Sequence, residues 1–395
     1  MNCRSPNSQL ITTDPVATSA LTRARLAIKS WPLQPADLPA ETALVGGAVR
    51  DALLNRLRQH PDLDLVVPSG AIALTRKLAQ RFRGSAVVLD AERDMGRLVL
   101  GPWNLDIAAR EGPDLTTDLL RRDYSINALG LPLKSNQPIE DPTGGLQDLQ
   151  QGQMRAISET NLLADPLRLL RGPRLAAELG FALRPETAAL IRFHHRCLSQ
   201  VAPERVLAEL EKLASCPRGD RGLQQVVDLE LLQPWLNRLK GSCEPLDAQD
   251  LTASERSEAL PLARLSRLLD AAALAQLRSS RRLQQRCVRL RRWALRLNGG
   301  PLSESEQLLL CRELEADLPA LTLLRPEACH GWMQRWRNPS DPLFHPRPPL
   351  DGTTLQKELG LKPGRELGAL LERLMLERAF GRAHDLQAAR DLRRD

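Results

Sequence analysis

The sequence predicts a mixed α/β domain, a mixed sheet with surrounding helices, followed by an all-α region. Residues 40–157 alternate short apolar runs, turns and helical segments, which is typical of an α/β domain. The second half is rich in Leu, Ala and Arg, a composition that favours helices. At 395 residues, the chain is long enough for two or more domains with a large core.

A glycine turn joins the first apolar run to the first helical segment. Residues 42–45 predict a short buried strand, and Gly46 and Gly47 let the chain turn without a Cβ in the way. Residues 48–58 have helical periodicity, and the positive end of such a helix would face an anion. Arg50, in the first turn, can reach the same anion with a planar fork of donors. Paired glycines are common, so a plain strand–turn–helix is the alternative.

Two carboxylates stand at the start of the next apolar run. Asp62 and Asp64 are spaced i, i+2, which places them on one side of a strand, with Leu63 and Leu65 on the other. Neighbouring carboxylates repel each other unless a cation lies between them, and Mg²⁺ typically takes one or two carboxylates plus substrate phosphates. Together with the glycine turn, this pair predicts a site for a nucleoside triphosphate and magnesium. A solvated loop ahead of a strand is the alternative.

A third segment combines arginines with a carboxylate and an amide. Asp123 and Asn127 are four residues apart, which places them on one face of a helix. A carboxylate and an amide can hydrogen-bond a ribose hydroxyl, and the adjacent Arg121 and Arg122 can neutralise phosphate. The alternative is a charged helix start followed by a buried run.

A fourth segment predicts a helix with an arginine-lined face. Asp165 suits the N-cap and Pro166 the first helical position. Arg168 and Arg171 follow at steps of three, so these side chains share a face with Asp165. Pro173, which follows Gly172, predicts a kink or an early end of the helix. An N-capped amphipathic helix with an arginine-rich outer face is the alternative.

These motifs occur in the order found in class II tRNA nucleotidyltransferases and bacterial poly(A) polymerases, which the chain resembles. The resemblance is carried by five ordered segments: Leu44–Asp51 with Asp62–Asp64, Arg121–Ala128, Asp141–Asp148, Asp165–Arg171 and Val201–Leu210. Two departures are Ala164, where the family has glutamate, and Arg174-Leu175, where it has an Arg-Phe pair.

The resemblance implies an α/β nucleotidyltransferase head and transfer of nucleotides from CTP or ATP to the tRNA 3′ end, with Mg²⁺ and pyrophosphate release. Asp62 and Asp64 would hold the metal ions, and Asp106 is the candidate third carboxylate on a neighbouring strand. Asp165 and Arg168 would pair with the edge of the incoming base. The implied nucleotide-binding residues are Gly46, Gly47, Arg50, Asp51, Arg121, Arg122, Asp123, Asn127, Asp165, Arg168, Arg171 and Arg174.

One short connection bears on specificity. Only seven residues, 111–117, separate Arg110 from Asp118, where CCA-adding and A-adding members carry a longer flexible loop. So short a connection can close a turn but is poorly suited to swinging into a site. This truncation resembles the CC-adding subtype, so we expect addition of two cytidines, with complete CCA addition as the alternative. A poly(A) polymerase and a catalytically silent RNA-binding relative are further alternatives.

The charge balance agrees with an RNA substrate. The formal net charge is +7 and the pI about 9.3, and cationic contacts to phosphate drive nucleic-acid binding. Aromatic residues make up only 3%, which argues against a base-stacking platform. Residues 276–296 carry arginines without any acidic residue, and Leu283, Val288, Leu290, Trp293, Leu295 and Leu297 are candidates for their buried side. The candidate RNA-binding residues there are Arg281, Arg282, Arg289 and Arg292. A solvated helix face is the alternative.

The predicted organisation has four parts. Residues 1–39 form an N-terminal extension and helix, 40–157 the catalytic head, 158–230 a helical neck carrying base recognition, and 231–395 a helical body and tail that bind tRNA. No run of 18 apolar residues or signal peptide is found, so no membrane span is expected. Seven scattered cysteines without CxxC spacing favour reduced thiols and a cytoplasmic location. The oligomeric state is left open.

Overall fold

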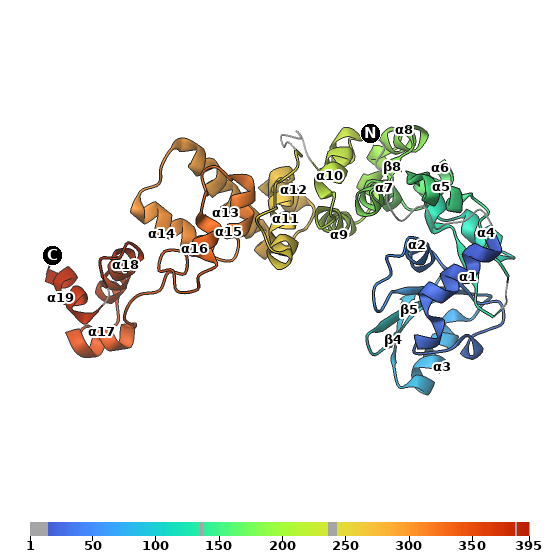
Figure 1. Cartoon of the computed structure of the whole chain (residues 1–395), viewed down its shortest axis with the longest axis horizontal. Helices are drawn as coiled ribbons and strands as arrows, with labels where there is room; N and C mark the ends of the chain where they lie inside the picture. The colour runs from blue at the N-terminus through green and yellow to red at the C-terminus, as the bar shows by residue number, and fades with distance from the viewer. Residues whose placement is uncertain (1–14, 135–136, 236–242, 384, 395) are drawn as a thin grey trace. The chain divides into compact units, whose positions relative to one another are not determined.

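The computed structural model describes most of the chain and divides it into two compact units (Figure 1). The described residues are 15–134, 137–235, 243–383 and 385–394. Unit 1 comprises Met1–Ala202 and Gln225–Pro234, and unit 2 comprises Pro203–Gln224 and Trp235–Asp395. The division thus falls within the segment 158–230 that the sequence assigns to a neck. In the described part of the chain, no helix is long and apolar enough to cross a membrane.

Unit 1 contains the predicted mixed sheet. Its six strands lie in the order β3-β4-β5-β2-β1-β6, with β2 and β5 parallel and the other neighbours antiparallel. The strands are β1 Ala43–Val45, β2 Leu63–Val67, β3 Ser85–Asp90, β4 Met95–Leu100, β5 Trp103–Ala109 and β6 Gly130–Pro132. Leu44, Leu63, Leu65, Leu105 and Ile107 are fully buried on the central strands. Burial of these side chains holds the sheet together and fixes its register.

Helices surround this sheet and continue beyond it. Those beginning in unit 1 are α1 Pro15–Leu26, α2 Gly47–Leu53, α3 Ala71–Phe82, α4 Leu115–Leu120, α5 Gly145–Gln151, α6 Glu159–Ala164, α7 Leu167–Leu179 and α8 Pro185–Phe193. Helix α3 packs on β3, β4 and β5, and α1 packs on α2 (Figure 1). A short parallel pair, β7 Gln153–Met154 and β8 Ala182–Leu183, lies among the later helices.

Two sequence-based expectations about helix ends were wrong. The first helix was expected over 48–58, but α2 ends at Leu53 because Asn55 takes a left-handed φ of 54°. The second was expected to kink or end at Gly172-Pro173; the early end was wrong, because α7 continues through Pro173 to Leu179. A Cβ on Gly172 would collide with the hydroxyl of Tyr124. Burial of this contact stabilises the helix where proline alone would weaken it.

Unit 2 is helical, as predicted for the second half. Its helices are α9 Pro203–Ala214, α10 Gly219–Asp228, which the division between units splits, α11 Ala253–Leu268, α12 Ala271–Gln276, α13 Arg281–Arg296, α14 Glu304–Glu313, α15 Leu318–Leu324, α16 Trp332–Trp336, α17 Gly352–Leu359, α18 Arg365–Ala379 and α19 Leu386–Arg394. Helix α11 packs against α9, α13 and α15. The last three helices share a small apolar cluster centred on Leu355, Leu370 and Leu374.

Candidate active site

Most of the predicted nucleotide-binding residues meet at one polar cavity in unit 1. The cavity measures about 300 Å³. Its lining residues are Gly46, Gly47, Arg50, Asp64, Arg122, Asp123, Asn127, Arg168, Arg171, Arg174, Leu175 and Glu178. All of them except Leu175 and Glu178 are residues that the sequence singled out. Strand ends, a glycine turn and one face of α7 therefore bring together four segments that are far apart in the chain.

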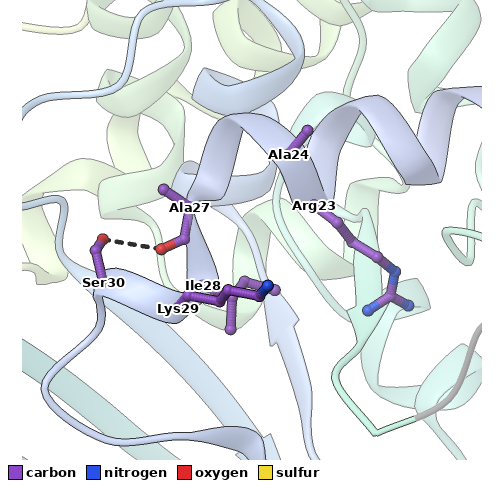
Figure 2. A pocket seen from close by; sticks show the side chains of 6 residues that line it. All are labelled: Arg23, Ala24, Ala27, Ile28, Lys29 and Ser30. Atoms are coloured by element: carbon purple, nitrogen blue, oxygen red, sulfur yellow. Dashed lines mark hydrogen bonds between the residues drawn. The ribbon is translucent and has the colours of Figure 1, made fainter.

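A second hollow in unit 1 is larger but has a different chemistry. It measures about 530 Å³ and lies at the end of α1, lined by Arg23, Ala24, Ala27, Ile28, Lys29 and Ser30 (Figure 2). One short stretch of chain supplies this lining, and Ser30 only closes the local turn by donating to the carbonyl of Ala27 at 2.8 Å. No carboxylate and no predicted site residue belongs to it. Its size therefore does not make it the catalytic cavity.

The glycine turn needs glycine at its first position. Gly46 has φ 71° and ψ −132°, in the region that disfavours side chains. A Cβ there would lie 3.3 Å from Oδ2 of Asp64 and 3.4 Å from Nη1 of Arg122. The turn thus brings the backbone close to both the acidic and the basic side of the cavity. Helix α2 begins at the next residue, Gly47.

Arg50 is held at the start of α2 by two side chains. Its Nε donates to Oδ1 of Asp51 and its Nη1 donates to Oδ1 of Asn127, each at 2.8 Å. Only 6% of the arginine is exposed, so these bonds fix the guanidinium while it lines the cavity. Asp51, which the resemblance implies as a nucleotide-binding residue, does not line the cavity.

The acidic residues lie side by side on neighbouring strands. Asp64 of β2 pairs in register with Asp106 of the parallel strand β5, which puts the two side chains on one face. Asp62 precedes β2 and accepts a hydrogen bond from Nδ2 of Asn104 at 3.3 Å. Burial raises the pKa of Asp64 to about 6; Arg122 opposes this shift, and the charges of Asp106 and Asp62 add to it.

The candidate third carboxylate has a partner already. Nε of Arg97, on β4, lies 2.7 Å from Oδ1 of Asp106, and its Nη2 lies 2.8 Å from Oδ2. By contrast, no ion pair joins the carboxylate of Asp64 to any residue that the structure describes. Among those residues no group of three or more His, Cys, Asp or Glu is arranged to hold a metal ion. Asp62 and Asp64, which the sequence predicts as metal ligands, form no ion pair with any described residue.

Asp123 is the most buried charged group of the cavity. Its Oδ1 accepts from the backbone N–H of Tyr124 at 2.8 Å and from Nδ2 of Asn127 at 3.2 Å, and Nη2 of Arg171 lies 3.1 Å from Oδ2. Burial alone would raise its pKa, but Arg171 and these hydrogen bonds lower it. The predicted contact with Asn127 is present, but on a short 3₁₀ turn over Ser125–Asn127 rather than on an α-helix.

Helix α7 supplies the arginines opposite the acidic residues. Nη1 of Arg168 donates to the carbonyls of Arg121 and Asn161, at 3.0 and 2.8 Å. The hydroxyl of Tyr124 donates to the carbonyl of Arg168 at 2.7 Å. Burial lowers the pKa of the Arg168 guanidinium. Arg168 is therefore held rigidly, and one of its nitrogens is used by the protein itself.

Glu178 lines the cavity but was missed in the sequence. Its Oε2 lies 2.5 Å from Nη1 of Arg174, one turn earlier on α7. The i, i+4 spacing of the two residues was the available signal. The pair places Arg174 on the cavity wall, on the part of α7 that follows Pro173.

Several predicted residues lie outside the lining. The guanidinium of Arg121 is exposed and pairs with Glu111, Nη2 to Oε2, at 2.7 Å. Asp165, predicted as the N-cap of α7, lies one position before it, because the N-cap is Pro166 and the helix begins at Leu167; Oδ1 of Asp165 accepts from the N–H of Leu167 at 3.3 Å. Asp62 and Asp106 lie next to Asp64 but do not line the hollow. Their predicted roles remain expectations.

The arginine-rich segment of unit 2 forms α13, but its charges are partly neutralised. Carboxylates from elsewhere in the chain form three ion pairs: Arg286 with Asp317, Arg292 with Glu313 and Arg296 with Glu306. Arg281, Arg282 and Arg289 are exposed and make no ion pair with any described residue. Two residues expected on the buried side are exposed, Val288 by 43% and Leu295 by 68%. Leu290 and Trp293 are buried as expected, and Cys287 and Ala294 complete the buried side.

Known proteins are similar to this chain in both fold and sequence. Residues 104–155 match the family described as the poly A polymerase head domain, and residues 180–241 match the probable RNA and SrmB-binding site of polymerase A. The CC-adding tRNA nucleotidyltransferase of Synechocystis sp. is 33% identical over 392 residues, covering 91% of this chain and 94% of the relative. The chain belongs to the tRNA nucleotidyltransferase family. It is therefore a nucleotidyltransferase enzyme.

The chain is also similar to an A-adding relative over half its length and to a solved CCA-adding enzyme in fold. The A-adding tRNA nucleotidyltransferase of Deinococcus radiodurans is 39% identical over 214 residues, which cover 53% of this chain and 48% of that relative. A CCA-adding enzyme in complex with CTP has the same fold, with a TM-score of 0.68 at 20% identity over 89% of this chain and 90% of that one. Both the CC-adding and the A-adding branch are thus represented among the similar proteins.

Proposed function

We propose that this nucleotidyltransferase transfers two CMP residues from CTP to the 3′ end of tRNA and releases pyrophosphate. The observation that carries the CC specificity is the connection between β5 and α4. Only residues 110–114 lie between the two elements, because α4 already begins at Leu115. So short a segment lacks the length to enter the cavity and reshape it for a second base.

Hydrogen bonds also hold this connection down. The N–H of Arg110 donates to the carbonyl of Val67 at 2.8 Å, and its Nη2 donates to the carbonyl of Pro113 at 2.7 Å. Asp114 caps α4 by accepting from the N–H of Thr117 at 2.8 Å. A segment fixed at both ends favours one shape of the cavity, and therefore one nucleotide.

The cavity offers complementary charges to a nucleoside triphosphate. In this proposal Gly47 and Arg50 bind the triphosphate at the start of α2, and Asp123 with Asn127 binds the ribose. Arg168, oriented by its bonds to two carbonyls, presents its remaining donors to the base, with Asp165 beside it. Side chains would then select the nucleotide without a nucleic-acid template.

Magnesium is the metal that we propose for Asp62 and Asp64. The donor set fits a hard cation, because Asp64 is a half-buried carboxylate that lines the cavity without an ion pair among the described residues, and Asp62 is two positions away. When bound, such an ion would activate the terminal hydroxyl of the RNA and stabilise the pyrophosphate that leaves. Substrate phosphates would complete its coordination.

We also propose that tRNA contacts the exposed arginines of α13 and that the enzyme works in the cytoplasm. Arg281, Arg282 and Arg289 offer unpaired guanidinium groups to phosphates, which is the sequence-independent part of RNA binding. All cysteines that the structure describes are free thiols, which suits a reducing compartment.

The test is nucleotide incorporation into defined tRNA ends. We expect purified protein to extend a tRNA that lacks its CCA end by two residues with CTP, and to add nothing to a tRNA ending in CC when ATP is supplied. Complete CCA synthesis would contradict the CC specificity, and ATP-dependent extension of unrelated RNA would favour a poly(A) polymerase. Asp64→Asn should reduce CTP incorporation on the order of 10²–10³-fold or more, because it removes a charge from the reacting centre. Unchanged incorporation would show that the metal site is elsewhere or that the activity is not the protein's own.

A further inference from the structure

The acidic residues of the sheet share a row with one arginine. Arg97 lies opposite Asp106 in the antiparallel register of β4 and β5, and Asp106 lies beside Asp64 in the parallel register of β5 and β2. The order across the three strands is therefore cation, carboxylate, carboxylate. The sheet itself fixes this order, since side chains at matching register positions lie on the same face.

The two carboxylates of this row differ in what they bind. Both oxygens of Asp106 accept from Arg97, at 2.7 and 2.8 Å, in the two-point geometry of the strongest charged hydrogen bonds. No comparable bond reaches the carboxylate of Asp64 from any described residue. The bond to Asp106 raises the pKa of Arg97, and the charges of Asp62 and Asp64 add to this shift. Arg97 is thus the cation bonded to Asp106, whereas Arg122 and Arg171 act on Asp64 through their charges.

We propose that Arg97 competes with a divalent metal ion for Asp106 and so lowers the affinity of the acidic cluster for that ion. The inference rests on the proposed function and adds a regulation of metal binding at the same site. Arg97 occupies one lone pair on each oxygen of Asp106, so a metal ion that binds Asp106 at either of these positions must break at least one of the two bonds. While Arg97 holds Asp106, only Asp62 and Asp64 of this cluster would bind the ion.

Exposure of Arg97 makes this exchange physically feasible. Its side chain is 42% exposed, whereas that of Asp106 is only 15% exposed. The guanidinium can therefore leave toward solvent while the carboxylate stays in place on β5. The Arg97–Asp106 bond would then alternate with a metal–Asp106 bond without a change in the sheet.

If Arg97 instead supported Asp106 as a metal ligand, its loss would weaken metal binding. The sign of the change in metal affinity therefore tests the proposal. Groups that support a metal ligand from outside raise metal affinity, and their loss typically weakens it about 10–100-fold. A competitor has the reverse sign. We expect Arg97→Gln to tighten Mn²⁺ binding by about 10-fold, a magnitude at the lower end of that range.

The experiment measures free Mn²⁺ by electron paramagnetic resonance in titrations of the full chain without nucleotide. The matched control is Arg93→Gln, which removes an equal charge just before β4. The side chain of Arg93 is 66% exposed, and its Nε lies 3.9 Å from Oδ2 of Asp90. No bond joins Arg93 to Asp106 among the described residues. We expect this control to change the dissociation constant less than about 2-fold, as for a screened surface charge. In an Asp106→Asn background, Arg97→Gln should have no further effect, since the contested ligand is gone.

Two results would overturn the proposal. One is unchanged or weaker Mn²⁺ binding by Arg97→Gln; the other is the same gain in the Asp106→Asn background, which would indicate a general charge effect. If Arg97→Gln does not fold, Arg97→Lys keeps the charge but loses the two-point contact, and it should tighten binding by a smaller factor. Failure of the proposed function would look different: Mn²⁺ binding would then persist in Asp64→Asn, whatever Arg97 does.

Discussion

The cavity of unit 1 and helix α13 of unit 2 both contain many arginines, but they use them differently. In the cavity, Arg50 and Arg171 are paired with buried polar groups, and the same side chains line a hollow of about 300 Å³. On α13, arginines such as Arg286 pair with carboxylates of other helices and hold the unit together, while Arg281 stays in solvent. A high density of arginine in the sequence therefore does not by itself mark a site. Arg286 and the buried Asp317 also line a hollow, of about 280 Å³, so what distinguishes the cavity of unit 1 is that residues from four distant segments meet there.

Removal of Asp123 should have the largest effect on stability, because the cavity depends on it. Asp123→Ala leaves Arg171 without its carboxylate and leaves the N–H of Tyr124 without its acceptor. Breaking a buried pair costs about 3–5 kcal/mol. The Arg171 side chain is 37% exposed, so we expect a smaller loss of about 2–3 kcal/mol in the free energy of unfolding.

Urea unfolding measures this loss, and hydrogen exchange of α7 peptides localises it. The control Arg281→Gln removes a charge from the exposed surface and should change stability by less than about 0.5 kcal/mol. If both variants behaved alike, the contrast between a buried cavity and a solvated helix face would be wrong.

The sequence could predict features that depend on residues close together in the chain, but not those that depend on distant residues. The glycine turn and the pair Asp62–Asp64 depend on local spacing, so the strand alternation was enough to find them. Glu178 was one helical turn from Arg174 and was overlooked, although its spacing was visible. The partner of Asp106 could not be predicted in this way, because Arg97 is placed by the register between β4 and β5.

The same limit bears on two of the errors on helices, those on α7 and α13. Where α7 continues through Pro173, Tyr124, which is far away in the sequence, packs where Gly172 has no side chain. Exposure of Val288 and Leu295 on α13 depends on which face the other helices of unit 2 cover. Tertiary packing decides such features, whereas periodicity gives only the existence of the helix.

Measurements of tRNA binding should distinguish the exposed arginines of α13 from those that form ion pairs. A triple variant, Arg281→Gln with Arg282→Gln and Arg289→Gln, should lower the slope of log affinity against log salt by about 2, since each lost phosphate contact removes about 0.7–0.9. The control pairs Arg286→Gln with Arg296→Gln, which removes charges that are bound to Asp317 and Glu306. It should lower the stability of unit 2 and leave the slope nearly unchanged. Equal slopes for the triple variant and the wild type would show that these arginines of α13 do not contact RNA.

The smallest effect is expected for an ion pair at the surface of unit 2. Nε and Nη2 of Arg337 donate to the carboxylate of Glu255 at 2.8 and 2.7 Å, and the N–H of Thr252 donates to the same group at 2.8 Å. The bond from Arg337 and the cap lower the pKa of Glu255 to about 2, against an ordinary value of 4.5. Because the folded pKa is the lower one, the pair's stabilisation is complete above pH 4.5 and is lost as the pH falls toward 2.

Glu255→Gln should therefore lower the stability at neutral pH by less than about 1 kcal/mol, since Arg337 is partly exposed to solvent. It should also remove part of the acid sensitivity between pH 4.5 and 2, measured by urea unfolding across this range. Glu258→Gln, one turn along on α11, changes an exposed carboxylate without an ion pair among the described residues and should leave the profile as it is. If Glu255→Gln also left it unchanged, the acid sensitivity would belong to more deeply buried carboxylates such as Asp123, whose pKa is likewise lowered. The cavity would then govern stability in acid as well as the chemistry proposed for it.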